Sequence, residues 1–428
     1  MSLRRLLLIL LVLVASLSIA GSYLLFRSGL YQPADDEPLP ALLIRDAMLF
    51  DGSTLRAGMQ VLVEGGVITC VDSVCAVPPG ARVIDGTGKT LLPGLIDLGA
   101  QYYSQSAESR DASPLRQLLA FTKQRPDVRR NLHRAGITTL RTAGDAPGNI
   151  LLLRKQLAEG DLEGPQLHAA GPYLTAPGGH PLATTYAAFP DIASQLVRTV
   201  GDSASARALA REWATAGFDG LYLVLDDRMR NLPKPAPAAV RELVAAAHRD
   251  RLRVFVWAGS AADVALAATA EADGILYGGA ALPDTATLRL MQELGICLVP
   301  CLAARQVQSD SLLSADTALL PLLYAAGVPV GAAGMVQGDR AFGAALHEEL
   351  EALVAAGLPP LAALAGCTRQ AARALAIDHL CGQVAPGYQA DLLLVDGRPW
   401  EQIADLRRVH TLIQRGRIVV ETGSLTGD

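Results

Sequence analysis

The sequence predicts an α/β fold, a (β/α)₈ barrel of the TIM type, preceded by one N-terminal transmembrane helix. Three observations support this prediction. Eight short apolar runs recur through the middle of the chain, short β-like runs lie on both sides of them, and an uncharged apolar stretch stands near the N-terminus. At 428 residues and 50% hydrophobic content, the chain has room for one large domain and a smaller one.

The N-terminal stretch from Leu6 to Phe26 contains no charged residue and is long enough to cross a hydrocarbon core of about 30 Å. Two arginines precede the stretch and one follows it, which places the short N-terminus in the cytoplasm. We therefore expect a signal anchor over residues 1–28, with the protein held in the inner membrane and its main domain in the periplasm. The alternative is a cleaved signal peptide and a secreted protein.

The segment 29–40 is rich in proline and acidic residues, which is typical of an extended linker. Short β-like runs separated by turn residues then fill residues 41–92. Similar runs return over residues 384–428, at the other end of the chain. The chain therefore carries β-structure on both sides of its central part.

The central part, residues 93–383, contains the eight apolar runs that we expect to form buried strands. These runs are 96–101, 137–144, 166–171, 219–225, 253–259, 273–279, 296–302 and 328–334. Segments of helical period such as SARALAREWATAG separate most of them, and parallel neighbouring strands require such crossovers. An open doubly wound sheet would give a similar pattern, but the count of eight favours a closed barrel.

If the main domain lies in the periplasm, its six cysteines are in an oxidising compartment, where thiols can form disulfides. Cys70 and Cys75 flank four residues that could form a tight turn, so we expect a disulfide between them. Cys297 and Cys301 lie on one strand-like run, where their spacing of about 13 Å forbids a direct bond. The remaining two cysteines, which could also pair, are Cys367 and Cys381.

Several motifs resemble the amidohydrolase superfamily, in its imidazolonepropionase-like branch. They are LLPGLIDLGAQ at 91–101, AGITTLRTAGD, AGFDGLYL, HEELEALVAAGLPPLAALAGCTRQAARAL and GQVAPGYQADLLLVDGRPWEQIADL. The resemblance runs from residue 42 to about residue 420. It implies that the segments 41–92 and 384–428 form one small discontinuous β-sandwich beside the barrel.

Members of that family hold zinc or another divalent metal at the C-terminal mouth of the barrel. The resemblance places the family's two strand-one histidines, its bridging lysine, its two later histidines and its strand-eight aspartate at Gly99, Gln101, Tyr222, Trp257, Tyr277 and Met335. None of these six residues matches the family's ligand. Glycine and tryptophan offer no usable lone pair, and the other side chains are weak or soft donors, so we expect no metal cofactor.

The loss of the metal would remove the nucleophile, because a bound metal lowers the pKa of water from 15.7 to about 7. We therefore expect a pseudoenzyme with a ligand-binding or scaffolding role in the cell envelope. Its bulky residues at the former metal positions would either fill the mouth or line a pocket for a small organic ligand.

The alternative is an active hydrolase of non-peptide or cyclic amide C–N bonds with a relocated or metal-free site. Its candidate acids and bases follow the predicted strands or lie in a glycine-rich loop. They are His180, Asp226, Asp227, Asp145 and Asp339. Each also has a structural interpretation, as a turn residue or a solvated carboxylate.

The net charge is −5 and no long cationic run occurs, so we expect no nucleic-acid partner. The expected partners are the membrane, through the N-terminal helix, and either a second copy of the chain or another protein. This last expectation rests on analogy with the family alone.

Overall fold

The computed structural model describes residues 39–100, 102, 127–142, 144–188, 190–227, 231–279, 281–306, 313–335 and 342–422. The predicted signal anchor at 1–28 and most of the linker lie outside the described residues, as do the candidates Gln101 and Asp339. Within those ranges, no helix combines the length and the apolarity that a membrane crossing requires.

Seven of the eight apolar runs form strands, and neighbouring strands pair in parallel. The strands are β8 (Leu95–Ala100), β9 (Ile137–Thr142), β10 (Gln166–Ala169), β13 (Gly220–Leu225), β14 (Arg253–Ala258), β15 (Gly274–Tyr277) and β16 (Cys297–Val299). Every residue of β8, β9 and β13 is buried, as expected for parallel strands covered on both faces.

The eighth run closes the barrel without forming a regular strand. Val330 bridges Leu298 in parallel on one side, and the Leu98 amide donates to the Ala332 carbonyl at 3.1 Å on the other. A further bond, from the Asp219 amide to the Ala169 carbonyl at 2.9 Å, links the third and fourth strands. The sheet therefore closes on itself, which excludes the open doubly wound alternative and agrees with the predicted TIM-type barrel.

The third strand contains a feature that the sequence did not predict. After a bend at Gly171, where φ is +70°, the chain continues as β11 (Tyr173–Thr175). A Cβ atom on Gly171 would lie 2.3 Å from Trp213 Nε1, so only glycine fits this approach. Strand β11 pairs with β13 and also with an added strand, β12 (Val197–Thr199).

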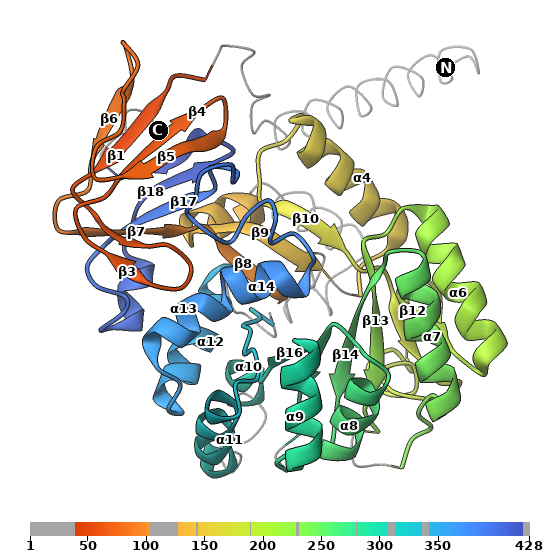
Figure 1. The fold of residues 1–428 in the computed structure, drawn as a ribbon. Coiled ribbons are helices and arrows are strands. Elements are labelled where there is room, and N and C mark those ends of the chain that lie inside the picture. The colour runs from red at the N-terminus through yellow and green to blue at the C-terminus, as the bar shows by residue number, and fades with distance from the viewer. Residues whose placement is uncertain are drawn as a thin grey trace, which may run out of the picture.

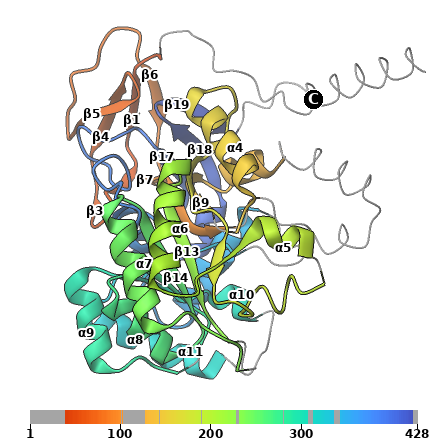
Figure 2. The ribbon, with the colours of Figure 1, turned by 90° about the vertical axis from the view of Figure 1, so that its right-hand side faces the viewer.

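Helices cover the outer surface of the barrel, and Figure 2 shows α6 and α7 in front of β13 and β14. The helices are α4 (Pro147–Glu159), α5 (Pro190–Leu196), α6 (Ser203–Ala216), α7 (Pro237–Arg249), α8 (Ala261–Thr269), α9 (Thr285–Leu294), α10 (Leu302–Gln306), α11 (Leu313–Ala325), α12 (Ala344–Ala355), α13 (Pro360–Gly366) and α14 (Arg369–Ala374). Local signals fix their ends: α6 begins with a capping box between Asp202 and Ser205 and ends at the left-handed Gly217.

The two terminal β-segments form two sheets beside the barrel (Figure 1). Their strands are β1 (Leu42–Arg45), β2 (Met48–Phe50), β3 (Leu55–Arg56), β4 (Gln60–Glu64), β5 (Val67–Asp72), β6 (Arg82–Asp85), β7 (Lys89–Pro93), β17 (Leu392–Asp396), β18 (Val409–Gln414) and β19 (Arg417–Glu421). One sheet has the order β5-β4-β1-β6 and the other β19-β18-β17-β7-β2-β3. Because β17 pairs with β7, segments from both ends of the chain share one sheet.

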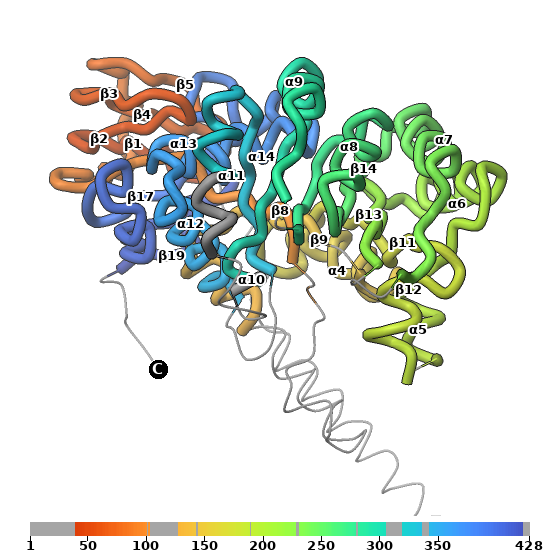
Figure 3. The backbone as a smooth tube through the Cα atoms, turned by 90° about the horizontal axis from the view of Figure 1, so that it is seen from below, coloured from red at the N-terminus to blue at the C-terminus, as the bar shows by residue number. Residues whose placement is uncertain are grey.

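These sheets lie at one end of the molecule and helices α6 and α7 at the other (Figure 3). Cys70 and Cys75 are joined by a disulfide at the end of β5, and Cys297 and Cys301 are free, as the sequence favoured. The sequence left open whether the remaining two cysteines pair, and the structure shows that they do not. Both are free and buried, each with its thiol directed to a carbonyl of its own helical turn; they are Cys367 and Cys381.

Candidate functional site

The interior of the barrel is lined by alternate side chains of its strands. On β13, Tyr222 and Val224 belong to the interior apolar cluster, whereas their neighbours on the same strand face the outer helices. This alternation follows from the two-residue period of a strand. Aromatic and aliphatic residues of the other strands complete the cluster, including Phe255, Leu276 and Val299.

Four of the residues that the resemblance places at the family's ligand positions meet in this cluster. Tyr222 is buried, Trp257 and Met335 are partly buried against it, and Gly99 lies beside Met335. A Cβ atom on Gly99 would lie 3.1 Å from Leu276 Cδ2, 3.2 Å from Ala333 Cβ and 3.4 Å from Met335 Sδ. The space that a histidine ring would need at this position is therefore taken by apolar side chains.

Tyr222 is held by aromatic and cationic neighbours. Its ring meets the ring of Tyr173 edge to face, with the centroids 5.3 Å apart. The guanidinium of Arg141 lies 5.2 Å from the centre of the Tyr222 ring and 3.9 Å from that of Phe255. Burial raises the pKa of Tyr222 above its ordinary value, so the phenol stays protonated and cannot replace an anionic ligand.

Trp257 is fixed by a carboxylate at the C-terminal end of the strands. Its Nε1 donates to Asp226 Oδ2 at 3.0 Å, and Gly278 leaves room for its ring. This contact joins a candidate acid of the alternative hydrolase to a residue that the resemblance places at a ligand position. Asp226 therefore serves in part to orient an indole.

Tyr277 departs from the expected arrangement. It is fully buried in the apolar cluster between the strands and the outer helices, whereas its neighbour Leu276 belongs to the interior cluster. The Tyr277 hydroxyl donates to the carbonyl of Ala281. Adjacent residues of a strand point to opposite faces, so a shift of one position decides whether a side chain reaches the interior.

These residues do not fit a divalent metal. The four positions that meet in the interior supply one glycine, one protonated phenol, one indole and one thioether, which together offer no charged donor. Across the part of the chain that the structure describes, no three His, Cys, Asp or Glu side chains lie close enough to share a metal ion.

The other candidate acids and bases are divided among separate contacts. Lys234 Nζ lies 3.8 Å from Asp227 Oδ2 and 2.9 Å from Asp263 Oδ2. Asp145 is buried and accepts from the Tyr102 amide at 3.1 Å. His180 is buried in its loop, and its Nδ1 shares a short hydrogen bond with the hydroxyl of Thr184, one turn further along.

Two interior residues were not singled out from the sequence. Arg141 is buried on β9 and donates to the carbonyls of Leu98 and Leu221, at 3.3 and 3.1 Å. Asp97 is buried on β8, and its Oδ1 accepts from the amides of Gly99 and Gly334. A charged residue inside an apolar strand run is the signal that could have identified both.

Burial lowers the pKa of Arg141 to about 10, which leaves its guanidinium charged at neutral pH. Burial also raises the pKa of Asp97 to about 6, against the opposing effect of its two amide donors. The interior therefore carries one permanent cation and one carboxyl group that titrates slightly below neutrality.

Comparison with known proteins identifies the family. The model of the amidohydrolase family matches residues 90–419. A solved amidohydrolase is 25% identical, with a TM-score of 0.74 over 89% of this chain and 99% of that chain. A Xaa-Pro dipeptidase with bound methionine is 24% identical, with a TM-score of 0.76 over 88% of this chain and 99% of that chain.

A molinate hydrolase is 20% identical, with a TM-score of 0.74 over 90% of this chain and 95% of that chain. The dipeptidase and this hydrolase establish likeness of fold alone. No curated protein sequence matches. Because the family model covers most of the sequence, this chain belongs to the amidohydrolase family.

Proposed function

We propose that this chain is an amidohydrolase without metal-dependent hydrolysis, which works as a ligand-binding or scaffolding protein. One observation carries the proposal: Gly99, Tyr222, Trp257 and Met335, which the resemblance assigns to four of the family's ligand positions, adjoin one another in an apolar cluster. A scaffolding role would involve another protein or a second copy of the chain.

The energetic argument is simple. A bound metal lowers the pKa of water by about 9 units, a difference of about 12 kcal/mol in the cost of making hydroxide at neutral pH. A single general base typically contributes a factor of 10² to 10⁴ in rate, or about 3 to 5 kcal/mol. A carboxylate at the mouth would therefore recover less than half of what the metal supplies.

We also propose that the protein is anchored in the inner membrane by residues 1–28, with its domain in the periplasm. The Cys70–Cys75 disulfide supports an oxidising compartment. The full chain should then sediment with membranes and enter the supernatant only when detergent is added. Recovery in the aqueous fraction without detergent would instead indicate cleavage of the anchor.

Metal content and hydrolysis test the main proposal on the same detergent-purified full chain. After incubation with zinc or manganese and exhaustive buffer exchange, we expect far less than one metal ion per chain by mass spectrometry. We also expect no hydrolysis of Xaa-Pro dipeptides or cyclic amides above background. An active amidohydrolase carried through the same steps is the control, and should retain both metal and activity.

A near-stoichiometric metal with chelator-sensitive hydrolysis would overturn the proposal. The metal-free alternative gives a different result, namely hydrolysis that survives a chelator. The contact between Asp226 and Trp257 at the strand ends is the observation that favours it. In that case Asp226→Asn and His180→Asn should abolish activity, whereas Asp250→Asn, at the exposed end of α7, should not.

A further inference from the structure

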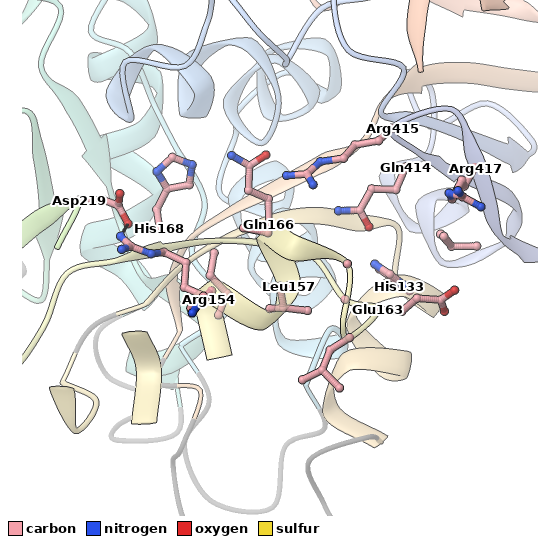
Figure 4. Close-up of a pocket in the computed structure, with 17 residues that line it drawn as sticks. His133, Arg154, Leu157, Glu163, Gln166, His168, Asp219, Gln414, Arg415 and Arg417 are labelled. Atoms are coloured by element: carbon pink, nitrogen blue, oxygen red, sulfur yellow. Dashed lines mark hydrogen bonds and ion pairs between the residues drawn. The ribbon is translucent and has the colours of Figure 1, made fainter. Parts of the chain in front are cut away.

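A second candidate site lies at the opposite end of the barrel from the mouth. It is a cleft with a volume of about 470 Å³, bounded by α4 and the chain that follows it, and by the β18–β19 hairpin (Figure 4). Gln166 at the start of β10 and Asp219 just before β13 line it, so it adjoins the N-terminal ends of the strands. Small-molecule sites have volumes of this order.

Cationic side chains dominate the lining of the cleft. Four of them, from both walls, face two carboxylates. Asp219 is already committed, because its Oδ2 accepts from Arg154 Nη1 at 2.6 Å and from the Ala169 amide at 2.8 Å. The cations are Arg154, Lys155, Arg415 and Arg417.

Glu163 is the second carboxylate. Burial raises the pKa of Glu163 to about 7, although Arg417 and Arg129 oppose the shift. In a large fraction of the molecules, the Glu163 carboxyl group is therefore protonated and neutral at physiological pH. Among the residues that line the cleft, the cations outnumber the charged carboxylates by at least two, although Lys155 Nζ also lies 3.9 Å from Glu159 Oε1, just outside the lining.

A buried polar atom without a hydrogen-bond partner among the described residues also lines the cleft. It is Nε2 of His168. His133 is 1% exposed and has the Gln414 side chain and the Gly164 backbone beside its ring, although neither ring nitrogen meets full hydrogen-bond geometry with them. Buried atoms without a partner are rare and costly in folded proteins, so His168 Nε2 points to a ligand or water that satisfies it.

Burial lowers the pKa of His133 to about 4 and lowers that of His168, so both rings are neutral near pH 7. A neutral imidazole donates one hydrogen bond and accepts another. Nearby, the side chain of Arg415 extends toward Gln166 (Figure 4). Charged and neutral donors are thus distributed around one small volume.

We infer that this cleft binds a small organic anion that carries carboxylate or phosphate groups. Arginine forks match the geometry of both groups, and the excess of cations disfavours a metal ion. The site is independent of the barrel mouth, so it stands whether or not the mouth catalyses hydrolysis. The site is lined by residues of the barrel and of the β18–β19 hairpin. A bound ligand would therefore hold these two parts together.

Calorimetric titration of the full chain with citrate and with pyrophosphate tests this inference. We expect at least one of these probes to bind at one site per chain, and the stronger of the two distinguishes a carboxylate from a phosphate ligand. Arg415→Gln should weaken binding about five- to twenty-fold, because it removes one charged donor. Gln166→Met, which removes the amide and keeps the volume, should also weaken it.

Arg251→Gln is the matched control. Arg251 is exposed, does not line the cleft, and has a left-handed backbone like Arg415, with φ of 61° against 49°. It should leave the affinity within two-fold of the wild type. The inference is overturned if neither probe binds at millimolar concentration, or if Arg415→Gln and Arg251→Gln change the affinity equally. Melting temperatures of all variants establish that each remains folded.

Discussion

Asp97 shows how one buried side chain organises the closing point of the barrel. Its Oδ1 accepts from the Gly99 amide at 3.0 Å and from the Gly334 amide at 2.8 Å. The second bond takes an amide of the eighth run that would otherwise be available to a strand ladder. Small residues of low strand propensity, at positions 331–334, fill the second half of that run, in agreement with its single bridge at Val330.

The raised pKa of Asp97, about 6, makes stability depend on pH. When a carboxyl group has a higher pKa in the folded state than in the unfolded state, it binds its proton more tightly in the folded protein. The free energy of unfolding therefore falls as the pH rises from the unfolded pKa, near 4, through the folded pKa. Asp97→Asn keeps the acceptor oxygen and has no charge to bury. The stability of this variant relative to the wild type should therefore be greater at pH 7.5 than at pH 5, by about 1 kcal/mol.

Urea unfolding at both pH values measures this difference. Asp250→Asn, an exposed substitution of the same kind, corrects for the simple loss of a charge. If the difference between Asp97→Asn and the wild type is the same at both pH values, Asp97 does not titrate as its burial indicates.

At the scale of elements, the strand runs could be placed from sequence because a buried parallel strand is a short apolar run bounded by turns. The bend at Gly171 and the added strand β12 could not, because they depend on contacts with Trp213 and β11. The Cys70–Cys75 disulfide is an intermediate case, since its short spacing made pairing plausible and the strand geometry brought the two thiols together.

The disulfide should stabilise the end of β5 and the chain that follows it. Closing so short a loop is worth about 2 kcal/mol on the chain-entropy model. The double variant Cys70→Ser and Cys75→Ser should therefore melt at a lower temperature than the wild type. A reductant should lower the melting temperature of the wild type and leave that of the double variant unchanged. An equal effect of the reductant on both proteins would show that the disulfide does not contribute this stability.

At the scale of the whole molecule, the sheets of the terminal β-segments and the barrel share one apolar core. Leu393 and Leu412 of the C-terminal strands belong to the same cluster as Leu140 of β9. The Gly94 amide donates to the Asp391 carbonyl at 2.8 Å, and Gln414 Nε2 donates to the Thr138 carbonyl at 3.2 Å. The strands of the C-terminal segment therefore support the base of the barrel.

A fragment limited to the barrel, residues 93–383, should consequently fail to fold. It would lose Leu393 and Leu412 from the shared cluster and expose Leu140 and its neighbours to water, at about 25 cal/mol per Å² of apolar surface. We expect aggregation or a melting curve without a cooperative transition by circular dichroism. A chain spanning 39–422 is the control, and a barrel fragment that melts as cooperatively as this control would contradict the shared core.

The sequence by itself determined the barrel strands and the weak donor chemistry of the residues that the resemblance places at the ligand positions. Both are local properties, because periodicity lies in neighbouring residues and an indole or a glycine lacks a ligand wherever it is placed. Only the tertiary structure decided that Tyr277 faces outward, that Arg141 lies inside the barrel, and that Arg415 reaches the cleft beside Gln166. These outcomes depend on strand register and on contacts between distant segments, and neither is specified by any short stretch of the chain.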